Sequence, residues 1–340
     1  MELVSKPAHQ GADTSISLGR ATDAGVVPPA PAADGSAEVR GADAEIPRWW
    51  DRHDPDRPVV FFRDQRKGLG DIVTILPACQ ILRSLAPRIR IVFQLHAGFH
   101  PLLVDHPDVD EILTLDDPTP EGRVINLTRV CATYETARLS RGLSVDKPRN
   151  RIFVEACQLP YAGERPELRV SAEAIAGTAD QYPALLGDKP RVGLVVRSAE
   201  RWKDYPWNDA LAGLLLSRGC EVFSIDKSQG LADSRVHRVT GLSLTDLMGF
   251  LLHLDVLITP DTGPLHIAEG LDIPTVAIFG SMCGDLRQTA YRATQTVAIQ
   301  HAVCGRQPCF YARCKGVNQI QPCMAQVHPS EVWRAVRAAM

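Results

Sequence analysis

The clearest pattern of apolar and polar positions along the chain lies between Asp255 and Gly280. Two short apolar runs, one starting at Val256 and one at Thr275, flank a polar turn and a segment whose apolar residues recur at helical spacing. Short apolar runs bounded by turn residues are typical of buried strands, and a spacing of three to four residues is typical of a helix. The pattern therefore predicts a strand, a loop, a helix and a second strand, which together form one βαβ unit.

The loop of this unit contains Asp261, Thr262, Gly263 and Pro264. Asp261 can cap the helix, Gly263 permits close backbone approach, and Pro264 suits the first helical position because its missing N–H would be unpaired there. The N–H groups of the first turn carry the positive end of the helix dipole and can bind phosphate. We interpret the loop as a pyrophosphate-binding site, with an ordinary capped turn as the alternative.

The same alternation of apolar runs and helical segments continues through most of the chain after Pro58. In the first half it predicts the helix Asp71–Leu85 and, separated by helical or turn segments, the strands Val59–Phe62, Ile91–Leu95, Glu111–Leu115 and Arg123–Leu127. In the second half, before the unit above, it predicts the strands Arg191–Val196 and Cys220–Ile225 and the helices Asn208–Arg218 and Leu244–Leu254. This alternation predicts an α/β protein with mostly parallel sheets that helices cover on both faces.

Three segments of different composition divide the chain. Residues 1–47 are rich in Ala, Gly, Pro, Ser and Asp without hydrophobic periodicity, so we expect a disordered N-terminal tail. Residues 48–187 and 188–340 are expected to form two Rossmann-like domains, with a hinge near Gly187–Pro190, because weakly periodic sequence precedes that point. Open α/β sheets bind ligands beyond the carboxyl ends of their strands, which predicts a site in the cleft between the two domains.

Composition narrows the class of protein further. The 340 residues, 45% of them hydrophobic, can bury a sizeable core in each of two domains. A formal net charge of -3 argues against general nucleic-acid binding, and no apolar run approaches the ~20 residues that span a bilayer. The first residues show no secretion signal, so we expect a soluble cytoplasmic protein whose nine cysteines are thiols or metal ligands. Any membrane contact is expected to be peripheral.

The turn before the first predicted helix contains Gly68, Gly70 and Asp71. It lacks the third glycine and the spaced acidic partner of a dinucleotide-binding loop, so it is weak evidence for a cofactor. A carboxylate at a helix start can accept a proton from a hydroxyl group, and it can equally cap its helix. For Asp71 the residues alone favour the cap.

A cationic loop follows the predicted strand that ends at Val196. Arg197, Arg201 and Lys203 can neutralise a diphosphate there, and Lys203 suits this task because it offers a point charge without planar geometry. A solvated basic loop is an equally good interpretation. His266, one turn into the later helix, can bind a ligand, although we favour packing or bracing of its loop.

A group of cysteines near the C-terminus is the remaining candidate for chemistry. Four thiols lie within about twenty residues: Cys304, Cys309, Cys314 and Cys323. Such density can hold a structural zinc or iron, but the spacings are wider than the paired Cys-x-x-Cys of typical zinc sites. Both a metal site and free thiols therefore remain open. The sequence contains no Walker loop and no zinc-protease helix, which leaves those enzyme classes without support.

Three stretches together resemble glycosyltransferase family 9, the ADP-heptose:lipopolysaccharide heptosyltransferases and their relatives. They are GLGDIVTILPACQILRSLAP from Gly68, DTGPLHIAEGLDIPTVAIFGS from Asp261, and a cysteine-rich stretch ending in CMAQVHPSEVW. Their order and separation match the family, and the resemblance runs from about Val59 to the C-terminus. It implies a GT-B fold with an N-terminal acceptor domain, a C-terminal donor domain and a last helix that crosses back.

The resemblance also implies roles for individual residues. Asp71 matches the proposed catalytic base, and Lys203 matches the lysine that contacts the donor diphosphate. The family's donor-binding Asp-Thr-Gly-x-x-His motif corresponds to Asp261, Thr262, Gly263 and His266.

Three further positions complete the implied donor site. Ser198 stands where a hydroxyl residue commonly meets phosphate, whereas Ala199 replaces a second hydroxyl that some relatives carry. Asp226, just after the strand ending at Ile225, is a looser candidate for the nucleoside ribose, and Arg197 is an additional cation for the phosphates. The departure at Ala199 leaves the identity of the donor open.

The implied reaction is a single displacement that inverts the anomeric carbon, with an ADP-activated heptose or similar sugar as donor. The acceptor is a lipopolysaccharide core or another envelope glycan, and no metal cofactor is required, since a lysine and a helix dipole can stabilise the diphosphate. Two alternatives remain open: a protein heptosyltransferase of the autotransporter type with the same fold, in which the cysteines hold a structural metal, and a non-catalytic sugar-nucleotide-binding protein.

Overall fold

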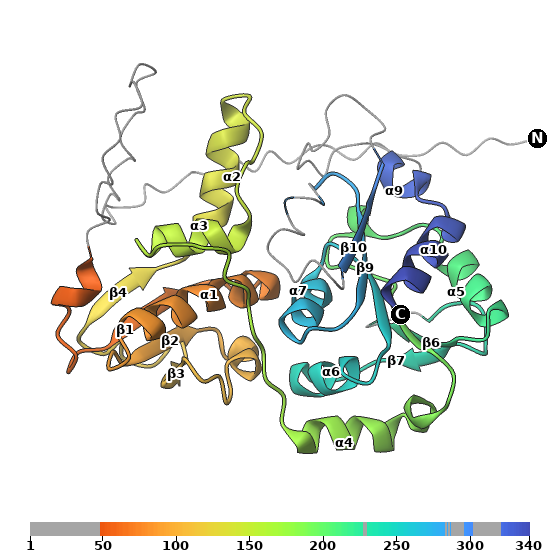
Figure 1. Ribbon diagram of the computed structural model, residues 1–340, viewed down its shortest axis with the longest axis horizontal. Coiled ribbons are helices and arrows are strands. Elements are labelled where there is room, and N and C mark those ends of the chain that lie inside the picture. The colour runs from red at the N-terminus through yellow and green to blue at the C-terminus, as the bar shows by residue number, and fades with distance from the viewer. Residues whose placement is uncertain (1–47, 227–229, 283, 285, 287–295, 302–320) are drawn as a thin grey trace, which may run out of the picture. The chain divides into compact units, whose positions relative to one another are not determined.

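Every apolar run that predicts a strand forms one in the computed structural model, which describes residues 48–226, 230–282, 284, 286, 296–301 and 321–340. The expected tail, residues 1–47, lies outside the described residues. The strands form two sheets, and all the pairings within them are parallel (Figure 1). The alternation of strands and helices along the sequence therefore correctly predicts the class of fold.

The two sheets follow one another along the chain. The first has the order β3-β2-β1-β4 and is formed by β1 (Val59–Arg63), β2 (Ile91–Leu95), β3 (Glu111–Leu113) and β4 (Arg123–Asn126). The second has the order β10-β9-β8-β5-β6-β7 and is formed by β5 (Arg191–Val195), β6 (Glu221–Ile225), β7 (His237–Val239), β8 (Val256–Pro260), β9 (Thr275–Phe279) and β10 (Thr296–Gln300). The short β7 and β10 were not anticipated from the sequence.

Helices connect these strands and cover the sheets. The described helices are α1 (Leu69–Leu85), α2 (Val130–Ser140), α3 (Arg149–Ala156), α4 (Ala172–Gln181), α5 (Asn208–Ser217), α6 (Leu244–Leu251), α7 (Gly263–Gly270), α9 (Pro322–Gln326) and α10 (Pro329–Ala339). Short 3-10 helices are η1 (Trp49–Arg52), η2 (Ala97–Leu102), η3 (Pro183–Leu186) and η4 (Arg201–Lys203).

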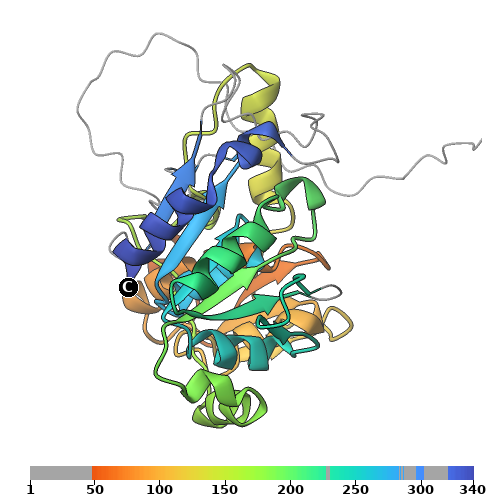
Figure 2. The same cartoon turned by 90° about the vertical axis from the view of Figure 1, so that its right-hand side faces the viewer.

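The strand β8 shows that the second sheet is covered on both faces. Its side chains are buried along its whole length, although neighbouring residues point to opposite sides of the sheet. Val256 and Ile258 pack into one hydrophobic cluster with residues of α5 and α10, whereas Leu257 packs into another with residues of α6 and α7. Figures 1 and 2 show α5 and α10 together on one face. Among the described residues, the last helix α10 thus packs on the second sheet, and the expected crossing back is not seen.

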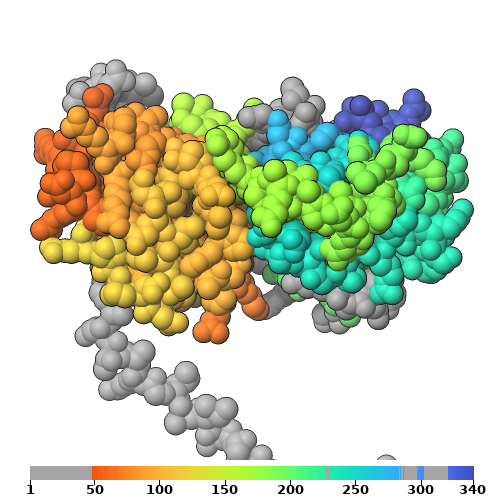
Figure 3. Space-filling view, turned by 90° about the horizontal axis from the view of Figure 1, so that it is seen from below, coloured from red at the N-terminus to blue at the C-terminus, as the bar shows by residue number. Residues whose placement is uncertain are grey.

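The segment between the two sheets contains a helix that the weak periodicity of residues 160–190 did not predict. Ser171 caps α4 by accepting a hydrogen bond from Ala174 N at 3.2 Å. The helix packs on α6 (Figure 3), where His253 Nε2 lies 2.8 Å from the carbonyl oxygen of Ile175. This linking segment is therefore tied to the second sheet by specific contacts.

Both halves contribute to one hydrophobic cluster. It contains α1 side chains such as Val73 together with Ile267 and Ala268 of α7, and the backbone N–H of Leu168 donates to the carbonyl of Gly270 at 2.8 Å. The division into domains at residue 187 stays a prediction. Within the described ranges, we find no helix long and apolar enough to cross a membrane.

Candidate active site

The first helix starts closer to its strand than the sequence suggested, and this changes the role of Asp71. Gly68 adopts a left-handed conformation with φ of 90° and precedes α1, which begins at Leu69, two residues before the predicted start. Asp71 therefore lies inside the first turn, and no side chain caps this helix start. The interpretation of Asp71 as a helix cap, which the residues alone favoured, is wrong, because the carboxylate is engaged elsewhere.

Two arginines from different elements hold the Asp71 carboxylate. Arg63, the last residue of β1, donates from Nη2 to Oδ2 at 2.9 Å, and Arg149, the first residue of α3, donates from Nη1 to Oδ1 at 2.7 Å. Arg149 also donates through Nε and Nη2 to the two oxygens of Glu135, each at 2.9 Å. Glu135 lies on α2, so this network joins four segments around one carboxylate.

The two guanidinium groups experience different surroundings. Burial lowers the pKa of Arg63, and the ion pair with Asp71 offsets only part of that effect. Burial also disfavours the cation of Arg149, but Asp71 and Glu135 together outweigh it and raise the pKa of Arg149 well above its usual value. Neighbouring carboxylates thus stabilise both cations, fully for Arg149 and in part for Arg63.

The loop before α7 also differs from the prediction in detail. Thr262, in an extended conformation, is the residue that precedes the helix, and Pro264 occupies the second helical position. The expected cap by Asp261 is therefore wrong. Asp261 is buried, and its Oδ2 forms an ion pair with Lys203 Nζ at 3.3 Å. His266 Nε2 lies 4.0 Å from Oδ1 of the same carboxylate.

Lys203 reaches this loop from η4, which follows β5. Its ammonium group lies 3.1 Å from a carboxylate oxygen of Glu200 and 5.1 Å from the centre of the Trp202 ring. The structure therefore brings together Lys203 and Asp261, two residues of the predicted donor site that are 58 positions apart in sequence. A lysine thus lies beside the loop that leads into α7, and a lysine and a helix start are both groups that can bind phosphate.

The remaining residues of the predicted donor site are held in place by protein contacts. The backbone N–H of Ser198 donates to Asp204 Oδ1 at 2.7 Å, and its hydroxyl group donates to the carbonyl oxygen of Glu200. Arg197 Nη1 lies 3.5 Å from Asp204 Oδ2. Asp226 is buried directly after β6, where its N–H donates to the Val239 carbonyl at 3.2 Å.

The starts of α1 and α7 meet, and glycines allow this contact. A Cβ at Gly70 would lie 2.2 Å from Cδ2 of His266, a distance at which one group must move. Gly263 is less crowded, since its Cβ would lie 3.2 Å from Leu69 Cδ2. The favoured interpretation of His266 as a packing residue agrees with this contact and with its exposed fraction of 6%. The Asp71 network and the Lys203–Asp261 pair thus flank one helix junction.

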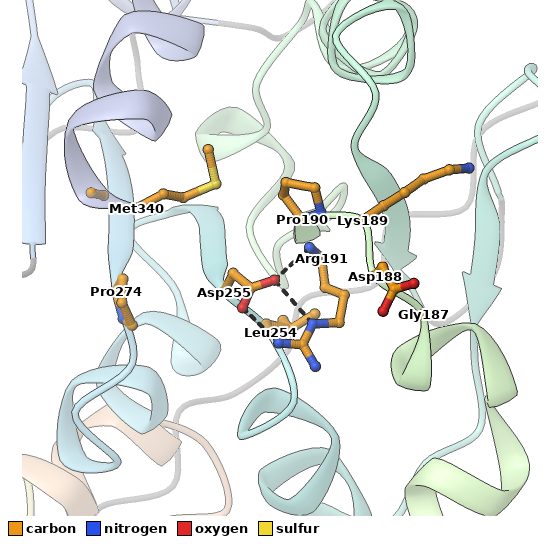
Figure 4. Close-up of a pocket in the computed structure, with 10 residues that line it drawn as sticks. Gly187, Asp188, Lys189, Pro190, Arg191, Leu254, Asp255, Pro274 and Met340 are labelled. Atoms are coloured by element: carbon orange, nitrogen blue, oxygen red, sulfur yellow. Dashed lines mark hydrogen bonds and ion pairs between the residues drawn. The ribbon is translucent and has the colours of Figure 1, made fainter.

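Two hollows in the second half differ in size and position. The larger, about 550 Å³, lies where β5, β8 and β9 begin (Figure 4). Arg191 there donates from Nη2 to Asp255 Oδ1 at 2.6 Å and from Nε to Oδ2 at 2.9 Å. A hollow of about 10 Å³ lies beside Lys203 and Asp261, at the opposite edge of the sheet. The larger hollow is therefore remote from the candidate site, and a nucleotide sugar would need more space than the smaller one offers.

The cysteine cluster can be described only in part. Cys304, Cys309 and Cys314 lie outside the described residues. Cys323, on α9, is buried, with its thiol 3.6 Å from Oε1 of Gln321. Within the portion of the chain that the structure describes, no cluster of three or more His, Cys, Asp or Glu side chains could hold a metal ion.

The sequence did not single out three residues of the network: Arg63, Glu135 and Arg149. Arg63 ends an otherwise apolar strand, which is an unusual place for a cation and is the only local signal for it. Glu135 lies 64 residues after Asp71, and Arg149 lies 78 residues after it. Both belong to helices that the sequence did not predict. Their convergence follows from the tertiary fold, which single-sequence spacing does not reveal.

Two parallel α/β sheets that follow one another along the chain, with candidate groups near the carboxyl ends of their strands, agree with a GT-B fold. The sequence profile of "Glycosyltransferase family 9 (heptosyltransferase)" matches residues 144–316, and the chain belongs to this family. The resemblance inferred from the three motifs is thereby confirmed.

Solved structures support the fold at low sequence identity. A family 9 glycosyl transferase from Veillonella parvula is 15% identical, with a TM-score of 0.63 over 84% of this chain and 98% of its own. ADP-heptose lipopolysaccharide heptosyltransferase II from E. coli is 15% identical, with a TM-score of 0.60 over 82% and 98%. The iron-containing dodecameric glycosyltransferase TibC from enterotoxigenic E. coli is 17% identical, with a TM-score of 0.64 over 83% and 76%. No curated protein matches the sequence.

Proposed function

We propose that this glycosyltransferase is an inverting heptosyltransferase that uses ADP-heptose or a similar nucleotide sugar. The single observation that carries the proposal is the junction of α1 and α7, which bring the Asp71 carboxylate and the Lys203 ammonium to the same helix contact. Transfer of a sugar from a diphosphate needs both a base and a cation. TibC, a structural relative, has been solved in complex with ADP-D-β-D-heptose, which supports this class of donor.

In the proposed mechanism, Asp71 accepts the proton of the acceptor hydroxyl group as its oxygen attacks the anomeric carbon. The bond from that carbon to the diphosphate oxygen breaks, and ADP leaves from the opposite side. One displacement at one carbon inverts its configuration. A base within hydrogen-bonding reach of the attacking hydroxyl group contributes typically 10²–10⁴-fold to such a rate.

On the donor side, the leaving diphosphate gains negative charge that cations and N–H groups must stabilise. We assign this task to Lys203 and to the start of α7 at Thr262 and Gly263, with Arg197 and the Ser198 hydroxyl group as further contacts. Asp226, at the end of β6, is assigned to the ribose.

The hollow beside Lys203 is smaller than a nucleotide sugar, so the proposed binding includes a rearrangement of the side chains around it. A phosphate would compete with Asp261 and Glu200 for the same ammonium group. Closure of the two halves over the bound donor would then exclude water, which could otherwise hydrolyse the donor. Lysine and the helix dipole supply positive potential to the diphosphate directly, so the proposed mechanism uses no divalent cation.

The proposed acceptor is a lipopolysaccharide core or another envelope glycan, reached at the cytoplasmic face of the inner membrane. A protein acceptor is the second candidate, and the observation that favours it is the likeness to TibC, which is iron-containing, together with the cysteines of this chain. Under that alternative, Cys304, Cys309, Cys314 and Cys323 hold a structural iron or zinc. Thiolates suit either metal. Metal analysis of the purified full chain tests this site.

The experiment that tests the function combines binding and transfer. Calorimetry with ADP, UDP, GDP and ADP-D-β-D-heptose identifies the nucleotide, and we expect ADP and its heptose derivative to bind. Transfer is then followed by mass spectrometry with envelope extract from a heptose-deficient bacterium, separated into glycolipid and protein fractions. A gain of one heptose on the glycolipid supports the glycan acceptor, and a gain on protein supports the alternative. Binding without transfer to either fraction would contradict an enzymatic role.

A further inference from the structure

We propose that Arg149 is a positioning residue for the base Asp71 and that Glu135 holds Arg149 in place for this task. The inference rests on the proposed function, because it assumes that Asp71 accepts the proton of the acceptor. It assigns different roles to the two arginines that contact this carboxylate. Arg63 holds Oδ2 from the protein interior, and Arg149 fixes the orientation of the carboxylate through Oδ1.

The first argument is the geometry of the contacts. Arg63 and Arg149 approach different oxygens of Asp71, at 2.9 and 2.7 Å, so together they fix the rotation of the carboxylate. The guanidinium of Arg149 is itself fixed by two parallel hydrogen bonds to Glu135. A planar group held on one edge can present its remaining N–H in only one direction, which a flexible ammonium group could not do.

The second argument is the difference in burial between the two arginines. The side chain of Arg63 is 2% exposed, whereas that of Arg149 is 24% exposed and that of Asp71 is 18% exposed. Arg63 therefore lies behind the carboxylate in the protein interior. Arg149 lies on the accessible side, from which an acceptor hydroxyl group could approach Asp71.

The third argument is that the position of Arg149 is unfavourable for the helix that carries it. Arg149 is the first residue of α3, its first turn contains no acidic residue, and no side chain caps it. A cation at the positive end of a helix dipole destabilises the helix. Local helix stability thus gives no reason for an arginine here, whereas the contacts with Asp71 and Glu135 do.

The charged and titratable groups around Asp71 set the direction of the expected pH effect. Arg63 on β1 and Arg149 on α3 contact the carboxylate directly, Glu135 and Cys131 on α2 interact with these arginines, and His266 on α7 faces the neighbouring Gly70. A nearby cation favours the ionised form of a carboxylate. Removal of Arg149 should therefore allow Asp71 to be protonated at higher pH, so that the acid limb of the rate profile moves to higher pH.

The test compares kcat and KM of four variants across pH, with ADP-D-β-D-heptose and the acceptor fraction that the wild-type protein modifies. Arg149→Gln should lower kcat about 10–100-fold, the loss expected for one charge-assisted hydrogen bond, and leave the Kd of ADP within twofold of wild type. Arg149→Lys keeps the charge and should restore part of kcat with the acid limb near its original pH. Glu135→Gln should lower kcat less than Arg149→Gln.

Arg151→Gln is the matched control. Arg151 lies on the same helix, is exposed, and pairs with Glu155 at 2.7 Å rather than with Asp71. Its substitution should change neither kcat nor the pH profile. Thermal unfolding of each variant separates loss of structure from loss of rate, and if Arg149→Gln does not fold, Arg149→Lys and Glu135→Gln carry the test.

The result that would overturn the inference is a lower melting temperature for the Arg149 and Glu135 variants with an unchanged kcat and pH profile. That outcome would make the network a structural brace between α1, α2 and α3. Failure of the proposed function would give a different result, namely no transfer by the wild-type protein. The two failures are therefore distinguishable in one set of measurements.

Discussion

The loops that precede α1 and α7 are built alike and present opposite charges. Each follows a parallel strand, has a glycine directly before or at the helix start, and leads into a helix without a side-chain cap. Before α7, the buried Asp261 carboxylate holds Lys203, so the loop presents a cation beside the helix start. At α1, buried Arg63 holds the Asp71 carboxylate, so the first turn of the helix presents an anion. The same strand–loop–helix unit thus presents a cation in one case and an anion in the other. In each ion pair the presented group is more exposed than its partner.

The largest expected effect concerns the anion of the first loop. Asp71→Asn keeps the shape of the side chain but removes its ability to accept a proton, so we expect turnover to fall about 10²–10⁴-fold. The Kd of ADP should change little, because the nucleotide contacts the other loop. Steady-state kinetics and calorimetry measure both quantities. Turnover within tenfold of wild type would contradict the assignment of Asp71 as the base.

The next effect concerns the cation of the second loop. Lys203→Ala should weaken ADP binding about 10–100-fold, since a hydrogen bond to a charged group contributes roughly 1.5–3 kcal/mol. Lys189→Ala is a suitable control, because this exposed lysine lies at the other edge of the second sheet and pairs with Glu221. Equal ADP affinity in the Lys203 variant and in this control would remove Lys203 from the donor site.

A smaller effect is expected where the two loops meet. Gly70→Ala would place a methyl group 2.2 Å from the His266 ring, and we expect a loss of about 1–3 kcal/mol in the free energy of unfolding. Denaturant unfolding measures this loss. Because the clash requires the ring, the double variant Gly70→Ala/His266→Ala should be less destabilised than the sum of the two single changes. Strict additivity would show that the contact does not constrain this junction.

The smallest effect is expected on the other side of the same junction. Gly263→Ala would bring a methyl group to 3.2 Å from the end of the Leu69 side chain, which can move aside. We expect a change below about 1 kcal/mol in the free energy of unfolding. Gly177→Ala on α4, where no atom lies within 4 Å, provides the baseline for an unhindered glycine. A loss as large as that of Gly70→Ala would mean that both loops are equally constrained.

The sequence predicted the class of fold because each buried strand has its own local signal. Runs such as the one ending at Phe62 or starting at Val256 need no knowledge of the rest of the chain. The sequence analysis did not predict α4, because this segment is weakly periodic and its packing on α6 depends on residues distant in sequence.

The candidate site was predictable only where a motif lies in one stretch. The Asp261–His266 loop and Asp71 could be identified in this way, although both expected caps were wrong. The predicted caps are absent because each carboxylate forms ion pairs with residues from other segments instead. Asp261 pairs with Lys203, and Asp71 pairs with the two arginines. Such pairs depend on tertiary structure, and local spacing contains no information about them.

The exclusively parallel pairing of the described strands has a consequence for how the chain reaches its structure. No neighbouring pair can close as a hairpin, because each needs a crossover, and β5 pairs with β8 only after two other units have been traversed. The bond between Arg191 and Asp255, for example, spans 64 positions. Folding is slow when contacts join distant positions, so the nascent chain should spend longer with open strand edges than a helical bundle of equal length.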